Sequence, residues 1–236
     1  MSPLAHNPTA PRKKYALLKF VRDQWNPAHP GKQIARVEGF DPETEVIGEP
    51  CRDFLRNMQR AVGLPVSGQF DEATMRLLLP PGIRGQVMAR AHAELGESEW
   101  PPGSNWGPVA EYIKAAGFSY GVPWCACFVF WVLTRTGFKR EHLPSGPAAV
   151  ESWLTFGNGH HLLKGAGESQ QGDLWIWEFG GNPHAHIGFC DEGVKGNLAY
   201  FIDGNVGANG GTVTDSTRAA YQIHAVIDLV KLSQVK

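Results

Sequence analysis

Apolar positions recur with a helical period in the first part of the chain and with a strand period in the last part. Spacings of three and four residues predict helices in Lys14 to Trp25, Cys51 to Val62, Val87 to Leu95, Val109 to Ala116, Gly121 to Gly137 and Pro144 to Phe156. Alternating or continuously apolar runs predict strands at Asp173 to Glu178, Ala185 to Cys190, Leu198 to Asp203 and Ala220 to Val230. Helices followed by an antiparallel sheet predict an α+β fold.

The run Pro80-Pro81-Gly82 interrupts every regular pattern and is the natural boundary between two domains. Before it, we expect a flexible tail over residues 1–11 and a small all-α domain of three helices over 12–80. After a linker at 81–85, residues 86–236 are expected to form the larger α+β domain. From the pattern alone, a three-helix bundle that binds no ligand remains an open interpretation of the first domain.

The charge balance and the amino-terminal pattern exclude several classes of protein. Lys and Arg number 22 and Asp and Glu 23, a net charge of −1, so the sequence offers no basic surface for nucleic acid or for a membrane. Lys19 and Arg22 break the one apolar run that could begin a signal peptide, and no segment approaches a transmembrane span. We therefore expect a protein that is made in the cytoplasm and has no membrane anchor. Nothing in the sequence indicates more than a monomer, so a monomer is expected.

Four cysteines, at positions 51, 125, 127 and 190, are too few and too scattered for a disulfide framework. On a helix, Cys125 and Cys127 point about 200° apart, which argues against a redox pair and against a shared metal ion. The sequence therefore predicts neither a metal site nor a cofactor.

Cys125 stands where a reactive thiol would be presented. Pro123 suits a helix entrance, and the residues three, four, seven and eight positions after Cys125 are all apolar. The thiol should thus lie in the first helical turn, where free N–H groups and the positive end of the helix dipole favour a thiolate. The alternative is a small buried hydrophobe, since cysteine in an apolar run commonly plays that part.

A cysteine nucleophile needs a base and a polar group that orients the base. His186 lies in an apolar strand that would hold its imidazole rigidly, and His184 points to the same face nearer the strand end. Asp203 and Asn205 end the next strand; by the strand period of two they should point to the same face, and either could accept from the histidine N–H. The alternatives are an ordinary strand histidine and a simple Asp-Gly-Asn turn.

In their order along the chain, these elements strongly resemble the CHAP family, cysteine- and histidine-dependent amidohydrolases and peptidases of cell-wall lysis. The resemblance covers roughly Gln86 to Leu229. It rests on Glu97-Ser98-Glu99-Trp100, Gly103-Ser104-Asn105, Pro123-Trp124-Cys125-Ala126, Gly172-Asp173-Leu174, His186-Ile187-Gly188 and Asp203-Gly204-Asn205. It implies a papain-like domain in which amino-terminal helices pack on an antiparallel sheet.

The same resemblance implies roles for individual residues. Cys125 would be the nucleophile and His186 the base and then the acid. The family usually has Glu where Asp203 stands, so the shorter side chain makes Asn205 the expected orienting group and Asp203 an electrostatic one. No metal is required.

Beyond the reacting groups, we expect Trp124, Trp106 and His184 to contact substrate, with Trp124 as a wall of the groove. Some relatives bind calcium in an Asp-rich loop, but Glu97 to Trp106 offers only two acidic residues, so no calcium site is predicted.

The segment Arg56 to Thr74 resembles the second half of a small three-helix peptidoglycan-binding module. The shared features are a helix containing glutamine, the pattern G-L-x-x-x-G and a final helix with a threonine in its first turn. Two features depart from that module: an insertion from His29 to Val37, and Met58 in place of the aromatic residue expected before Gln59. The resemblance implies that the first domain binds the cell wall.

Together these features predict a bacteriophage endolysin whose partner is bacterial peptidoglycan and which reaches the wall after a holin opens the membrane. The bond cleaved would be that of an N-acetylmuramoyl-L-alanine amidase or of a peptide-stem or cross-bridge endopeptidase. A virion-associated lysin and a bacterial hydrolase exported by another route remain open. So does a non-catalytic wall-binding or tail protein that keeps the fold.

Overall fold

The computed structural model describes residues 49–68, 82–179, 182–207 and 211–236. The chain divides into two compact units, Met1–Pro81 and Gly82–Lys236. The predicted tail at 1–11 and the predicted helix Lys14 to Trp25 lie outside the described residues, so the three-helix domain stays a prediction. Among the helices that the structure describes, none combines the length and apolar character of a membrane-spanning segment.

In the first unit, helix α3 (Glu49–Val62) confirms the helix predicted from Cys51 to Val62. It ends at Gly63, whose φ of 78° lies in the left-handed region that favours glycine. The Leu64 N–H donates to the carbonyl of Gln59 at 2.9 Å, and the Gly63 N–H donates to that of Arg60 at 3.2 Å. This is the hydrogen-bond pattern of a Schellman motif, which satisfies carbonyls at the helix end.

Gln59 ties the following turn to α3. Its side chain is fully buried; Nε2 donates to the Ser67 hydroxyl at 2.9 Å and Oε1 accepts from the Gly68 N–H at 2.8 Å. A buried amide needs such partners on both its donor and its acceptor side. The glutamine that carried the resemblance to a wall-binding module therefore has a structural role inside this unit.

The second unit contains five α-helices and several 3₁₀ turns in its described part. The helices are α5 (Ile83–Ala93), α6 (Ala110–Ala115), α7 (Cys125–Arg135), α8 (Val150–Gly159) and α9 (Leu229–Leu232). The 3₁₀ turns are η2 (Gly107–Val109), η3 (Arg140–His142), η4 (Ala166–Glu168) and η5 (Ala220–Gln222).

The start of α5 corrects one predicted boundary. Residues 83–85, predicted as linker, belong to this helix, which begins at Ile83, four residues before the Val87 start predicted from the apolar pattern. Arg84, Gly85 and Gln86 continue no apolar period, so the pattern gave no signal there. The helix predicted within Pro144 to Phe156 is α8, which begins at Val150 and continues beyond the predicted end to Gly159.

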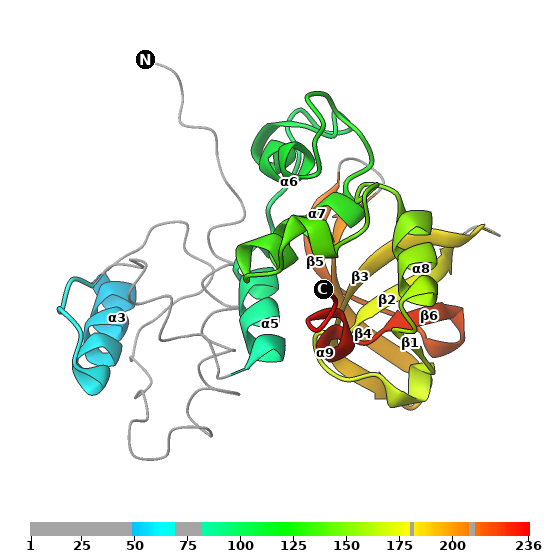
Figure 1. The fold of residues 1–236 in the computed structure, drawn as a ribbon. Helices are drawn as coiled ribbons and strands as arrows, with labels where there is room; N and C mark the ends of the chain where they lie inside the picture. Colours follow the sequence, from blue (N-terminus) through cyan, green and yellow to red (C-terminus); the bar gives the residue numbers. More distant parts are fainter. Residues whose placement is uncertain (1–48, 69–81, 180–181, 208–210) are drawn as a thin grey trace. The chain divides into compact units, whose positions relative to one another are not determined.

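In the part of the chain that the structure describes, six strands form one sheet in the order β1-β6-β2-β3-β4-β5, with every neighbouring pair antiparallel. Their bounds are β1 (Leu163–Lys164), β2 (Leu174–Phe179), β3 (Asn182–Lys195), β4 (Leu198–Val206), β5 (Thr212–Ala219) and β6 (Ile223–Ile227). Helices followed by an antiparallel sheet confirm the α+β prediction for this unit (Figure 1).

Three parts of the sheet differ from the prediction. The segment predicted as one strand, Ala220 to Val230, is divided among η5, β6 and α9. Strands β1 and β5 were not predicted. The sequence of β5, TVTDSTRA, contains a single large apolar residue, Val213, so it carries no alternating signal.

Helix α7 packs between the sheet and the other helices. Each residue from Cys125 to Leu133 is buried, so α7 is covered on all sides along this stretch. On the sheet side, the rings of Phe128 and Phe189 (β3) meet edge to face with centroids 6.0 Å apart. On the other side, the Tyr112 ring of α6 lies 4.9 Å from that of Trp131. This burial fixes the position of the helix start.

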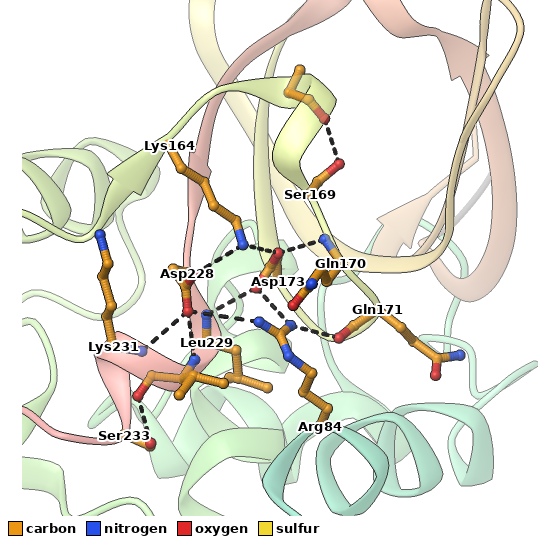
Figure 2. Close-up of polar contacts among 12 residues, drawn as sticks. Arg84, Lys164, Ser169, Gln170, Gln171, Asp173, Asp228, Leu229, Lys231 and Ser233 are labelled. Carbon is orange, nitrogen blue, oxygen red and sulfur yellow. Dashed lines mark hydrogen bonds and ion pairs between the residues drawn. The ribbon is translucent and has the colours of Figure 1, made fainter.

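A cluster of ion pairs joins α5, β1, β2 and α9 (Figure 2). Asp173, just before β2, is fully buried and is held by two cations: Arg84 Nη1 at 2.7 Å and Lys164 Nζ at 2.6 Å. Its carboxylate also accepts from the backbone N–H groups of Leu229 at 3.0 Å and Gln170 at 2.6 Å. The pairing and these hydrogen bonds satisfy a charge that burial would otherwise make very costly.

Asp228 is the second carboxylate of this cluster and the N-cap of α9. It accepts from Lys164 at 3.0 Å and from the N–H groups of Val230 and Lys231, and Arg84 lies 3.6 Å away. Partial burial alone would raise the pKa of Asp228, but the Lys164 ammonium and the two N–H groups outweigh it and lower that pKa. The cluster therefore fastens the start of β2 and the end of the chain to α5.

Candidate active site

Cys125 is the first residue of α7, as the sequence predicted. The preceding residue, Trp124, has a non-helical backbone, and the first turn contains no acidic side chain. The first N–H groups of a helix have no intrahelical acceptor, so they and the helix dipole favour a negative sulfur at this position. Cys125 is 6% exposed, so it is not completely shielded from solvent.

The thiol of Cys125 is hydrogen-bonded to the imidazole of His186 on β3. The Nε2 atom of His186 lies 2.7 Å from Oδ2 of Asp203 on β4. Because Nε2 faces the carboxylate, Nδ1 is the ring nitrogen left for the sulfur. An Nε2–H directed at a carboxylate fixes the tautomer in which Nδ1 can accept the thiol proton.

The charge state of His186 follows from these neighbours. Burial alone would lower its pKa, but a Cys125 thiolate and the hydrogen-bonded Asp203 outweigh burial and raise the pKa of His186 to about 10. The protonated imidazole is therefore the favoured form at neutral pH. A thiolate beside an imidazolium is the reactive arrangement for a cysteine nucleophile.

The hydrogen-bond partner of the His186 imidazole is Asp203. The expectation that Asn205 would orient the imidazole is therefore wrong. The carboxylate is fully buried, and its second oxygen, Oδ1, accepts from the Ser216 hydroxyl at 2.9 Å. Its short side chain reaches the histidine because Gly188 stands directly opposite in the strand pairing. A Cβ at Gly188 would lie 2.7 Å from the Cβ of Asp203, so glycine permits the close approach.

Asn205 lies where β4 departs from a regular strand. Its φ of 63° is left-handed, and the pairing of β4 with β5 shifts register between Asp203 and Val206. The Oδ1 atom of Asn205 occupies the space beside Gly211 that a Cβ there would need. The period-two argument that placed Asn205 on the same face as Asp203 fails at this irregularity.

Trp124 is fully buried, so the prediction that it forms a wall of the substrate groove is wrong. Its ring packs under Gly204, where an added Cβ would lie 2.5 Å from the ring, and the Tyr112 ring is 5.7 Å away. Trp124 thus supports the turn after Asp203.

The other two residues expected to bind substrate give less direct information. Trp106 is half-buried, and the Lys114 ammonium lies 5.3 Å from its ring centroid. His184 belongs to β3, but its side chain lies outside the described residues.

Sequence reasoning missed the role of Glu99, which ties the loop before α6 to the site. Its Oε1 accepts from the N–H groups of Gly103 and Gly211, both at 2.7 Å. Its Oε2 accepts from the Asn105 N–H at 2.8 Å and lies 3.4 Å from Nε1 of Trp124. The Glu99 carboxylate thus accepts hydrogen bonds from backbone N–H groups of the protein itself. Across the described ranges, no three His, Cys, Asp or Glu side chains gather as metal ligands do.

Among the cysteines whose side chains the structure describes, the other two, Cys127 and Cys190, are buried free thiols. Burial raises the pKa of each to about 12, which disfavours the thiolate. Of the three, only Cys125 is paired with a histidine that carries a carboxylate partner.

Comparison with protein families gives a match to the CHAP domain over residues 117–205. No curated protein and no solved structure matches the chain. The matched range includes Cys125, His186 and Asp203 and leaves out Glu99 and β5. The second unit therefore contains a CHAP domain, a type of domain with peptidoglycan hydrolase activity in which a cysteine and a histidine cleave amide bonds.

Proposed function

We propose that this chain hydrolyses an amide bond of bacterial peptidoglycan, with Cys125 as nucleophile, His186 as acid and base, and Asp203 orienting the imidazole. The observation that carries this proposal is the contact sequence from the Cys125 thiol through His186 to the buried Asp203 carboxylate. Among these three catalytic roles, the proposal differs from the sequence-based expectation only in the group that orients His186, which is Asp203 and not Asn205.

In the first half of the reaction, the Cys125 thiolate attacks the amide carbonyl carbon and a tetrahedral oxyanion forms. The Cys125 N–H at the helix start is available to donate to that oxygen. The imidazolium of His186 gives its proton to the amide nitrogen, the C–N bond breaks, and the amine leaves an acyl thioester on Cys125.

In the second half, His186 is neutral and takes a proton from water as that water attacks the thioester. The C–S bond then breaks, the acid is released, and the thiolate and the imidazolium are restored. Asp203 keeps Nε2 occupied throughout, so every proton transfer passes through the nitrogen that faces the sulfur.

The wider role that we propose is that of a phage endolysin. The chain would act as a monomer on the wall after a holin opens the membrane, and the first unit would bind peptidoglycan. Support for the wall-binding part comes from the resemblance of Arg56 to Thr74 to a wall-binding module. The bond cleaved is either the lactyl–L-alanine amide or a peptide bond of the stem or cross-bridge.

Digestion of purified peptidoglycan, followed by mass spectrometry of the soluble products, tests the activity. An amidase frees stem peptides that begin with L-alanine, whereas an endopeptidase leaves the lactyl amide intact and creates termini within the stem or bridge. New reducing sugar ends would contradict amide cleavage. A wild-type protein that releases nothing, while sedimenting with walls, would favour the non-catalytic alternative.

Wall binding by the first unit is tested with a truncated chain of residues 82–236. If the first unit is the binder, we expect sedimentation with purified walls to weaken by roughly tenfold or more, since one of two linked contacts is lost. Circular dichroism of the truncated chain checks that it is folded. Equal sedimentation of both proteins would assign wall binding to the second unit.

A further inference from the structure

Strand β5 lies beyond the range that matches the CHAP domain and supplies two polar side chains to Asp203. The strand pairs along β4, with Ser216 opposite Phe201 and Arg218 opposite Ala199. The Ser216 hydroxyl donates to Oδ1 of Asp203 at 2.9 Å. Nη2 of Arg218 lies 3.9 Å from Oδ2, the same oxygen that faces His186.

Two buried rings hold Arg218 in this position. The centre of its guanidinium lies 5.1 Å from the ring centroid of Trp177 and 5.6 Å from that of Phe201. The Trp177 ring also lies 5.0 Å from the imidazole of His186. One aromatic side chain therefore lies beside both the arginine and the catalytic histidine, and cation–π contacts of this kind restrain a guanidinium.

A fixed cation at this distance affects both ends of the Asp203–His186 pair. It attracts the Asp203 carboxylate, which is fully buried. It also opposes the imidazolium, because two positive charges then share one carboxylate oxygen. In the described contacts, His186 and Asp203 have two other charged or titratable neighbours. These are Cys125 from α7, beside His186, and Arg218 from β5, beside Asp203. Strand β2 contributes the Trp177 ring, which lies beside His186.

We propose that Ser216 and Arg218 are positioning residues of the reaction: Ser216 fixes the Asp203 carboxylate, and Arg218 limits how strongly that carboxylate holds the proton on His186. The balance matters because His186 must release this proton to the leaving amine and then accept one from water. The inference rests on the proposed roles of Cys125 and His186.

Arg218→Gln and Arg218→Lys test the charge. We expect the basic limb of the pH profile of kcat/KM, which reports loss of the His186 proton, to move upward by about 1 pH unit in Arg218→Gln. Without the nearby cation, the imidazolium is easier to keep. Arg218→Lys retains the charge and should return this limb most of the way. Arg135→Gln is the matched control, because Arg135 also packs on a tryptophan, 5.6 Å from the Trp131 ring.

Ser216→Ala and Ser216→Thr test the orientation. Loss of the hydroxyl should lower kcat roughly tenfold with KM unchanged, since it removes one hydrogen bond to the carboxylate. Threonine keeps the hydroxyl and suits a strand, so Ser216→Thr should retain most of the wild-type kcat.

Alkylation of Cys125 by iodoacetamide across the same pH range, read by mass spectrometry of its peptide, separates the two proposals. The proposed function is refuted if Cys125 of the wild-type protein is alkylated like an ordinary thiol and the wild-type protein releases no wall products. If the wild type is active and Arg218→Gln has the same pH profile as the wild type in both the hydrolysis and the alkylation assay, the proposed role of Arg218 is overturned. If Arg218→Gln is unfolded by circular dichroism, Arg218→Lys and the Ser216 pair decide the matter: equal kcat values for Ser216→Ala and Ser216→Thr overturn the role of β5.

Discussion

Replacement of Cys125 by alanine is expected to lower the rate of peptidoglycan hydrolysis by about 10⁴-fold or more, with little change in the fold. The variant keeps the helix start, His186 and Asp203, but it has no atom that can form the thioester. Because the nucleophile and its base act as a unit, removal of one leaves the other with nothing to activate. The measurement is the initial rate of product release from purified walls.

Cys127→Ala is the matched control for this experiment. Cys127 is two residues further along α7, is also fully buried, and carries a thiol whose pKa burial raises to about 12. Removal of its sulfur should cost about 1 kcal/mol of stability and leave the rate within about twofold of wild type. Comparable rates for Cys125→Ala and the wild type would show that the chain does not use cysteine catalysis.

Asp173→Ala is expected to lower the free energy of unfolding by about 3–5 kcal/mol, the usual cost of breaking a buried ion pair from one side. The change leaves the Lys164 ammonium, which is 10% exposed, with Asp228 as its remaining partner in the cluster. It also takes the acceptor from the N–H groups of Gln170 and Leu229. Urea denaturation followed by circular dichroism measures the loss.

Asp215→Ala serves as the control for that measurement, because Asp215 is an exposed aspartate on β5. A surface substitution of this kind should change stability by no more than about 0.5 kcal/mol. If the two alanine variants unfold at the same urea concentration, the cluster shown in Figure 2 contributes nothing measurable to the fold.

The sequence by itself determined the elements whose signal is local. The apolar run after Cys125, with Pro123 before it and Gly137 after it, was enough to place the thiol at the start of a helix, and α7 begins there. Continuous apolar runs likewise located β2, β3 and β4 and placed His186 on a strand. Helical and strand periods are properties of neighbouring residues, so they can be read without knowing what they pack against.

Only the tertiary structure decided which polar groups meet at the site. The choice of Asp203 over Asn205 depends on the register between β3 and β4 and on the irregularity after Asp203. The burial of Trp124 depends on the approach of Gly204. Glu99 and the β5 pair lie far from Cys125 in the sequence, on segments whose small polar residues have no periodic pattern. Their roles come from contacts between distant segments, and those contacts are fixed by strand pairing and packing, which no local pattern records.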